Sequence, residues 1–228
     1  MKKIFLFSLM FFFSLCLSAQ TDSSAFIIPK IPDTLILPDG SVIPTSSLDS
    51  IQKVKGWGSV SLSFQDDGTH VHPGKSAAEQ NEADKKLNAH LNEPAPDFAF
   101  KDLTGESFSL ASLKGKIVVL NFWFTQCGGC IAEMAELNKL KHAYDGKDVV
   151  FLAITFDDAA KIKTFLEKKK FEYAIIPDAK KTCNDYDIYG YPTSMVIDRK
   201  GAVRFINCSL DRDIKSQLSH AIAEMKPI

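Results

Sequence analysis

The stretch that decides the fold runs from Ile117 to Cys130 and reads IVVLNFWFTQCGGC. The part up to Phe124 is a continuous apolar run, which is typical of a strand buried on both faces of a sheet. Apolar residues then recur at three-residue steps, as on one face of a helix: Ile131, Met134, Leu137 and Leu140. The sequence therefore predicts a buried strand that leads into a helix, with Cys127 and Cys130 at the junction.

The chain after this junction keeps alternating between strand and helix patterns. The predicted strands cover Val149–Ile154 and Tyr173–Ile176, and the predicted helices cover Ala159–Lys169 and Lys180–Ile188. This order implies parallel strands joined by right-handed crossovers. We therefore expect an α/β fold, with a mixed sheet and flanking helices, over residues 94–228.

The last part of the chain predicts a hairpin and a helix. Thr193–Ile197 and Val203–Ile206 flank Asp198-Arg199-Lys200-Gly201, a hairpin signature that adds an antiparallel edge to the sheet. Asp211 is expected to cap a final helix. The apolar face of that helix carries Ile214, Leu218, Ala221, Ile222 and Met225.

The N-terminus has the pattern of a secretory signal peptide. Two lysines precede a short apolar run that ends at Leu17, and small residues follow it. The run is shorter than the roughly 20 apolar residues that a membrane span requires. We expect cleavage after Ala19, so that residues 1–19 are removed and the mature chain is exported to a bacterial periplasm. Lipid attachment at Cys16 is the alternative, although Phe13-Ser14-Leu15 stands where a lipoprotein signal has small residues.

Residues 20–93 are poor in long periodic segments and are predicted to form an extension or linker with a few short strands. Thr34–Leu37 and Ser41–Ile43 flank a turn signal and are expected to form a hairpin. Val60–Phe64 alternates between apolar and polar residues, as a strand does. Lys75–Asn92 is polar and indicates a linker or a loosely held helix.

The pair of cysteines in Cys127-Gly128-Gly129-Cys130 carries the chemistry that the sequence predicts. A helix N-terminus presents free N–H groups and the positive end of the helix dipole, and both favour a thiolate over a thiol. We therefore predict redox chemistry, with Cys127 as the exposed, reactive cysteine. A zinc site is an alternative, but it lacks a second close pair of ligands. A purely structural disulfide is another, although so short a loop would stabilise little.

Five stretches of the C-terminal domain together match the pattern of a known family: Ala95–Phe98, Leu110–Lys116, Asn121–Trp123, Cys127–Glu133 and Gly190–Thr193. On these stretches, the chain from Pro96 to about Met225 resembles thioredoxin-like thiol–disulfide oxidoreductases of the TlpA/ResA type, which are exported or membrane-tethered bacterial proteins. The family has Trp before the first cysteine and Pro before the second, whereas this chain has Gln126 and Gly129. The resemblance implies a thioredoxin-like sandwich, and the two departures bear on the redox potential and the direction of electron flow.

The resemblance also assigns roles near the cysteines. Cys127 matches the family's nucleophile and Cys130 its resolving cysteine, so that the two would form the redox-active disulfide. Glu133 matches an acidic residue that moves protons during exchange. Its alternative role is that of a carboxylate favoured only by the helix dipole.

Three further residues are candidates for the substrate-facing side of the site. Pro192 matches the family's cis-proline beside the active site. A cis bond there lets the backbone of Tyr191 pair with an extended substrate chain. Trp123 is a second candidate for substrate contact, with packing in the core or at the rim as its alternative.

These features predict an enzyme that exchanges dithiols and disulfides with envelope proteins, with reductase as the favoured direction. The cysteines themselves carry the two electrons, so we expect no cofactor and no metal. The resemblance implies that a membrane electron-donor protein supplies the reducing power. The near balance of 27 basic and 28 acidic residues excludes the strongly basic surface that nucleic-acid binding needs.

Two other functions stay open. A peroxidase of the peroxiredoxin type shares this fold, but it places a threonine three residues before the reactive cysteine. Here Thr125 lies two residues before Cys127. A non-catalytic binding module in an envelope complex is the other alternative, and a lack of disulfide-reducing activity would favour it.

The two remaining cysteines of the C-terminal domain are predicted to lie near the site. If Asp198–Gly201 forms the turn of the hairpin, Cys208 falls opposite Pro192 or Thr193, at the active-site end of the sheet. Cys183 lies on the helix that leads toward this end. Three arrangements stay open: a disulfide between the two, two separate buried thiols, or a relay in which Cys208 exchanges with Cys127.

Overall fold

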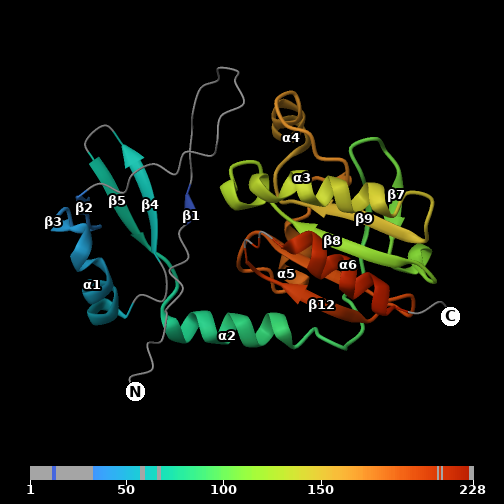
Figure 1. The fold of residues 1–228 in the computed structure, drawn as a ribbon, viewed down its shortest axis with the longest axis horizontal. Coiled ribbons are helices and arrows are strands. Elements are labelled where there is room, and N and C mark those ends of the chain that lie inside the picture. The colour runs from blue at the N-terminus through green and yellow to red at the C-terminus, as the bar shows by residue number, and fades with distance from the viewer. Residues whose placement is uncertain are drawn as a thin grey trace. The chain divides into compact units, whose positions relative to one another are not determined.

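The computed structural model describes residues 12–13, 33–56, 60–65, 68–209, 211 and 213–225. The chain divides into two compact units, residues 1–82 and 83–228, and helix α2 (Ala77–Asn88) crosses the boundary between them. Figure 1 gives the element labels along the ribbon.

The N-terminal unit holds a small sheet. Its strands are β1 (Phe12–Phe13), β2 (Thr34–Ile36), β3 (Val42–Pro44), β4 (Val60–Gln65) and β5 (Gly68–Pro73), in the spatial order β1-β4-β5-β2-β3. A 3-10 turn, η1 (Thr45–Ser47), leads into α1 (Leu48–Lys55). The predicted hairpin is confirmed, because β2 and β3 pair antiparallel, and the strand predicted at Val60 is β4. Its described apolar core is small and centres on Leu35, Leu37, Leu48 and Val71.

The C-terminal unit contains all the strands and helices that the sequence predicts after Pro94. The strands are β6 (Ala99–Lys101), β7 (Ser107–Ser109), β8 (Ile117–Phe122), β9 (Val149–Ile154), β10 (Ala174–Ile176), β11 (Thr193–Ile197) and β12 (Val203–Asn207). The helices are η2 (Ala111–Leu113), α3 (Gly128–Ala143), α4 (Ala159–Leu166), α5 (Lys180–Asp185) and α6 (Ile214–Glu224). The polar segment predicted as a linker or loose helix contains α2, whose Leu87 is buried.

The central sheet has the order β10-β9-β8-β11-β12. Strands β8, β9 and β10 are parallel, as the alternation of strands and helices predicts. Strand β11 pairs antiparallel with both β8 and β12, so the terminal hairpin supplies the antiparallel edge. The predicted α/β fold with a mixed sheet and flanking helices is confirmed.

Two apolar layers cover the two faces of this sheet. On one face, Val119 of β8 packs in a cluster with residues of α3, α4 and α6, including Met134, Ile162 and Leu218. On the other face, Leu120 of β8 packs in a cluster to which α5 and η2 contribute. Figure 1 shows α3 and α6 lying along the sheet. All six residues of β8 are buried, which explains why its sequence lacks polar alternation.

The start of the last helix differs from the prediction. Helix α6 begins at Ile214, and its N-cap residue is Asp213, whose side chain makes no capping hydrogen bond. The carboxylate of Asp211 instead accepts the backbone N–H of Asp213 at 2.8 Å and the side-chain amide of Gln217 at 2.5 Å. The prediction that Asp211 is the cap residue is therefore wrong by two positions, although its carboxylate does bind the first turn.

The ends of the chain bear on the predicted domain boundaries. The predicted signal peptide, residues 1–19, lies outside the described residues apart from β1. Within the described ranges, no helix is both long enough and apolar enough to cross a membrane. The C-terminal compact unit begins at residue 83, earlier than the boundary predicted at residue 94.

Candidate functional site

The sequence places Cys127 at the start of α3, and the structure gives this position its local chemistry. Strand β8 ends at Phe122, and a short loop carries the chain to Cys127, which is the N-cap residue of the helix. The Cys127 Sγ accepts the backbone N–H of Cys130 at 3.1 Å. An N-cap side chain that accepts from the first helical turn is stabilised when it carries negative charge. The geometry therefore favours a thiolate at Cys127.

Cys127 and Cys130 form a disulfide, with their Cα atoms 5.2 Å apart. Both side chains are buried in this oxidised form, with Cys127 4% and Cys130 2% exposed. The predicted order of exposure holds by a small margin, but Cys127 is far less exposed than the sequence suggests. The loop that leads from β8 to Cys127 and the loop that contains Pro192 form the rim of this site.

One of these loops is anchored by a buried carboxylate that the sequence analysis missed. Asp157 follows β9, is 5% exposed, and accepts the backbone N–H of Thr125 at 2.7 Å. Its other oxygen accepts from Lys161 at 2.6 Å. Burial raises the pKa of Asp157, but the hydrogen bonds from Lys161 and Thr125 outweigh it and hold the pKa below its ordinary value. The ionised carboxylate thus fixes the loop two residues before Cys127.

The loop that contains Pro192 lies beside the end of β8. The Tyr191–Pro192 peptide bond is cis, as predicted, and Thr193 pairs with Phe122 across the sheet. The Tyr191 ring is half-buried and meets two aromatic rings edge-on, that of Phe124 at 5.3 Å and that of Phe156 at 5.7 Å. The structure therefore brings the predicted substrate-facing loop next to the segment that leads into Cys127.

Trp123 does not lie on the surface of this site. Its side chain is fully buried, and its ring packs against Phe165 at 5.3 Å and Phe171 at 5.5 Å. Because a buried ring cannot touch a bound polypeptide, the expectation of a substrate contact is corrected to its alternative, core packing. The aromatic rings at the rim are instead those of Phe124, Phe156 and Tyr191.

Glu133 lies one turn beyond Cys130 on α3 and is 3% exposed. Its Oε1 accepts the backbone N–H of Asp211 at 2.8 Å. Burial raises the pKa of this carboxyl to about 7, and the hydrogen bond from Asp211 opposes that rise. The alternative of a carboxylate at the surface, favoured only by the dipole, does not fit this burial. A buried acid with a pKa near neutrality is suited to giving and taking protons.

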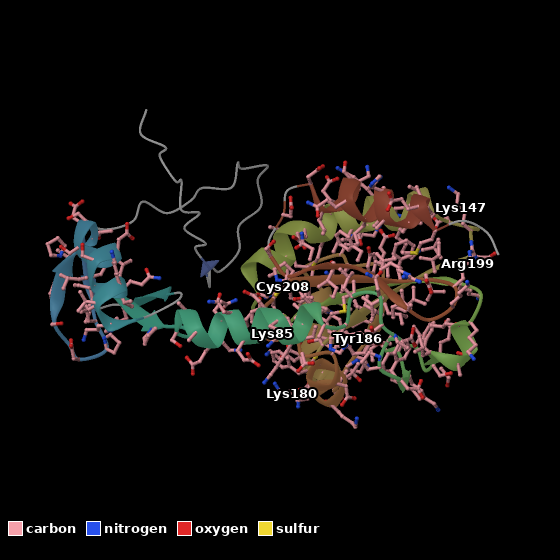
Figure 2. All side chains as sticks on the ribbon, turned by 90° about the horizontal axis from the view of Figure 1, so that it is seen from below. Lys85, Lys147, Lys180, Tyr186, Arg199 and Cys208 are labelled. Atoms are coloured by element: carbon pink, nitrogen blue, oxygen red, sulfur yellow. A yellow bond between two sulfur atoms is a disulfide. The ribbon has the colours of Figure 1, made fainter. Side chains whose placement is uncertain are left out.

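Cys183 and Cys208 are both free thiols. Strand β12 pairs Asn207 with Ser194, which places Cys208 beside Thr193 at the Pro192 end of the sheet, as predicted. Both thiols pack with the cluster that contains Tyr186, whereas Cys127 belongs to the cluster on the other face. Figure 2 labels Cys208 and Tyr186. The arrangement of two separate thiols is the one observed, rather than a disulfide between them, and the relay from Cys208 to Cys127 stays a prediction.

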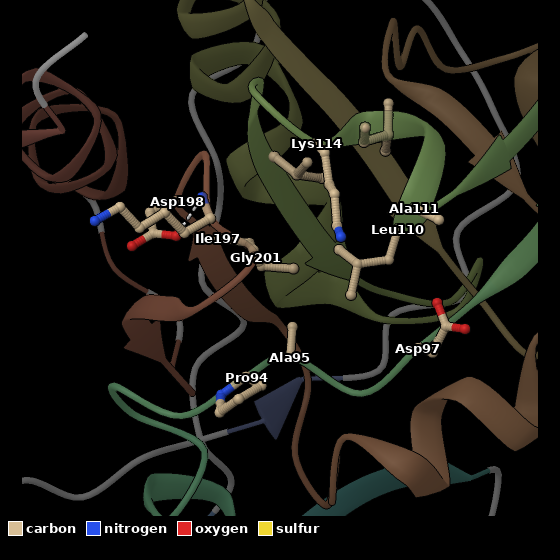
Figure 3. A pocket seen from close by; sticks show the side chains of 12 residues that line it. Pro94, Ala95, Asp97, Leu110, Ala111, Lys114, Ile197, Asp198 and Gly201 are labelled. Atoms are coloured by element: carbon tan, nitrogen blue, oxygen red, sulfur yellow. Dashed lines mark hydrogen bonds between the residues drawn. The ribbon is translucent and has the colours of Figure 1, made fainter. Parts of the chain in front are cut away.

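A cavity of about 210 Å³ opens at the opposite end of the sheet, and Figure 3 shows it close up. Its lining is largely aliphatic and includes Ala95, Leu110 and Ile197. It lies beside the turn of the β11–β12 hairpin, away from Pro192. No group of three or more His, Cys, Asp or Glu side chains that could hold a metal ion occurs in the part of the chain that the structure describes.

The chain is similar to known proteins over its C-terminal unit. A model of the AhpC/TSA family matches residues 91–206. The thioredoxin-like protein YneN of Bacillus subtilis (strain 168) is 36% identical over 132 residues, a match that covers 56% of this chain and 77% of that protein. The thiol-disulfide oxidoreductase ResA of Bacillus anthracis is 32% identical over 147 residues, covering 64% of this chain and 83% of ResA.

Solved structures agree with these matches. A protein from Chlorobium tepidum classed as a thiol:disulfide interchange protein DsbE superposes with a TM-score of 0.55 and 28% identity, covering 59% of this chain and 96% of that one. The thioredoxin domain of a thiol-disulfide oxidoreductase from Bacteroides vulgatus superposes with a TM-score of 0.52 and 26% identity, covering 58% and 97%. The region shared with these proteins is the unit that carries the disulfide.

Proposed function

The chain belongs to the AhpC/TSA family and is a thioredoxin-like thiol–disulfide oxidoreductase, and on that premise we propose that it reduces disulfides of exported proteins through Cys127 and Cys130. The observation that carries this proposal is the position of Cys127 as the N-cap residue of α3, with its Sγ accepting the Cys130 N–H. A second sulfur within disulfide reach completes the pair.

Reduction of a substrate runs in two steps that conserve electrons. The Cys127 thiolate attacks one sulfur of the substrate disulfide, a bond forms between the two, and the other substrate sulfur leaves as a thiolate that takes up a proton. Cys130 then loses its proton and attacks Cys127 Sγ, which forms the Cys127–Cys130 disulfide and releases the second substrate thiolate. The substrate gains two electrons, and the enzyme dithiol loses two.

Two neighbours support these steps in the proposal. Glu133, one turn from Cys130 and buried, accepts the Cys130 proton as the second step begins. Tyr191 and Pro192 offer the backbone along which an extended substrate chain pairs, and the half-buried rings of Tyr191 and Phe124 form the adjoining surface. No resident cofactor takes part in either step.

The direction and the compartment are parts of the same proposal. An exported reductase needs electrons from outside its own fold, and a membrane electron-donor protein would re-reduce the Cys127–Cys130 disulfide. The apolar run that ends at Leu17 supports export through a cleaved signal peptide, with a periplasmic location.

A trapping experiment tests the proposal. Reduced Cys130→Ala protein should hold a mixed disulfide between Cys127 and its substrate, because the resolving thiol is missing, and mass spectrometry would identify the partners. The double variant Cys127→Ser/Cys130→Ala is the matched control and should trap nothing. Wild-type protein should reduce an added protein disulfide faster than its oxidised form oxidises the matching dithiol.

Other outcomes would support other functions. Consumption of peroxide without disulfide exchange would favour a peroxidase. Binding of partners by wild type and double variant alike, with no exchange, would favour a non-catalytic module.

A further inference from the structure

Glu133 has one carboxylate oxygen for which the described residues supply no hydrogen-bond partner. Oε1 accepts from the backbone of Asp211, but Oε2 is buried and has no hydrogen-bond partner among the described residues. Leaving a buried polar atom without a partner is costly, and such atoms are rare in native proteins. We therefore expect a hydrogen-bond donor close to Oε2.

Tyr173 presents a second such atom. Its side chain is 3% exposed, and its hydroxyl has no hydrogen-bond partner within the described part of the chain. The ring is fixed between Phe151, at 5.0 Å, and Phe171, at 4.9 Å. It belongs to the same apolar cluster as Cys127 and Cys130. The hydroxyl is thus held in one place inside the layer that contains the disulfide.

The segment that carries Tyr173 packs against α3, the helix that carries Glu133. Asn138 of α3 accepts the backbone N–H of Glu172 at 2.9 Å and donates to the Lys170 carbonyl at 2.9 Å. Burial raises the pKa of Tyr173, and the negative charge of Glu133 raises it further. Among the described residues, the negative charge of Asp211, in the loop before α6, also acts on Glu133, and Cys130 lies one turn away on the same helix. In the part of the chain that the structure describes, Asp211, Cys130 and Tyr173 are thus the titratable groups beside this carboxyl.

We propose that Glu133 Oε2 and the Tyr173 hydroxyl share one internal water, and that Tyr173 is a positioning residue for Glu133. Buried waters bridge polar groups that otherwise lack partners, and one water can satisfy both atoms. This inference rests on the proposed disulfide exchange and adds to it the group that controls proton transfer.

The proton follows a defined route in this arrangement. When Cys130 attacks the mixed disulfide, its proton passes to the ionised Glu133 carboxylate, the bond between Cys127 and the substrate breaks, and the released substrate thiolate takes a proton from solvent. The Tyr173 hydroxyl donates through the water to the carboxylate. Removal of that hydroxyl therefore favours the protonated acid, which cannot accept the Cys130 proton.

Tyr173→Phe tests the proposal because it removes only the hydroxyl. In oxidised protein, the NMR resonance of the Glu133 carboxyl carbon is followed against pH. It is assigned as the resonance that disappears in Glu133→Gln. We expect its pKa to rise by about 0.5–1 unit in Tyr173→Phe. The resolving step, measured from a preformed mixed disulfide at Cys127, should slow by about 3-fold near pH 6.5 and converge with wild type near pH 9.

Tyr186→Phe is the matched control. Tyr186 is also fully buried, but its hydroxyl donates to the Pro96 carbonyl at 2.8 Å and it packs in the cluster on the other face of the sheet. Its variant should lose stability without moving the Glu133 titration. An equal shift in both variants would indicate general loosening and would overturn the proposal, as would an unchanged titration in Tyr173→Phe.

Two further outcomes keep the inference separate from the proposed function. A high-resolution crystal structure of wild type should place a water within about 3.2 Å of both atoms, and direct contact without water, or no contact, would overturn the shared site. If wild type exchanges no disulfides at all, the proposed function fails, while the titration still decides whether Tyr173 acts on Glu133.

Discussion

At the scale of single residues, Cys127 and Cys130 differ less in exposure than in what their sulfurs contact. Cys127 Sγ receives the N–H of Cys130 at the helix N-terminus, whereas Cys130 lies inside the first turn and is 2% exposed. Backbone donors and the helix dipole stabilise a thiolate only at the first of these positions. The two thiols of the reduced protein should therefore differ in reactivity.

Alkylation of the reduced protein checks this difference. With iodoacetamide near pH 6, Cys127 should be modified about 10-fold faster than Cys130, because only the thiolate reacts. Cys183 and Cys208 should react slowly, since burial raises the pKa of both thiols. Fragment mass spectrometry distinguishes the four sites, and faster labelling of Cys130 would reverse the assigned roles.

The raised pKa of Glu133 predicts how the stability of the folded protein depends on pH. Its pKa in the folded protein is raised to about 7 by burial, so between roughly pH 4.5 and 7 the folded state binds more protons than the unfolded state. The stability due to the protonated acid is present below this window and is lost as pH rises through 7. The loss is on the order of 2–3 kcal/mol.

Denaturation of the oxidised Glu133→Gln variant measures this pH-dependent contribution to the free energy of unfolding. The amide keeps the shape but does not ionise, so the variant should lose less stability than wild type between pH 5 and pH 8. Urea midpoints at the two pH values give the comparison. Parallel losses in the two proteins would mean that the carboxyl titrates as an ordinary surface group.

At the scale of elements, the loop before α3 depends on a contact from the next strand. Asp157 connects the end of β9 to the Thr125 N–H and to Lys161. Asp157→Asn removes the charge and should destabilise the protein by about 1–3 kcal/mol, because a buried charge-assisted bond is lost. Thermal unfolding at pH 7 measures the loss. Asp145→Asn, at an exposed ion pair, is the control and should change stability little.

The same contact marks the limit of prediction from sequence. The apolar runs of β8 and β9 and the three-residue steps of α3 predict these elements directly, because burial on both faces or on one stripe leaves a visible pattern. The hairpin turn likewise fixes the position of Cys208. The burial of Glu133 and Trp123 and the Asp157–Thr125 bond depend on which elements pack together, and no local pattern records that packing.

At the scale of the whole molecule, the chemistry belongs to the C-terminal unit. The family match covers residues 91–206, and both cysteines of the disulfide lie inside it. The compact unit begins earlier, because α2 contributes Leu87, which is 2% exposed, to the cluster around Tyr186. Tyr189, in the loop before Pro192, also donates a hydrogen bond to Asp84 of α2. The part of α2 from Ala83 onward therefore belongs to the domain that holds the site.

Two shortened chains test where the domain begins. A chain that starts at Lys75 keeps the capping box of α2, in which Ser76 and Glu79 exchange hydrogen bonds, and should match the chain from residue 20 in disulfide exchange. A chain that starts at Pro94 loses Leu87 and the backbone bonds of Asn92 and Glu93 to Val203.

The chain that starts at Pro94 should be the less stable of the two. Loss of a buried leucine alone costs about 2–5 kcal/mol, so the chain from Pro94 should unfold at a clearly lower urea concentration. Leu87→Ala in the chain from Lys75 is the matched control and should reproduce most of the loss. Equal stability of the two shortened chains would place the boundary at residue 94, where the sequence predicts it, and would make α2 a linker. A lower rate of disulfide exchange in the chain that starts at Lys75 than in the chain from residue 20 would instead assign the N-terminal unit a part in the reaction.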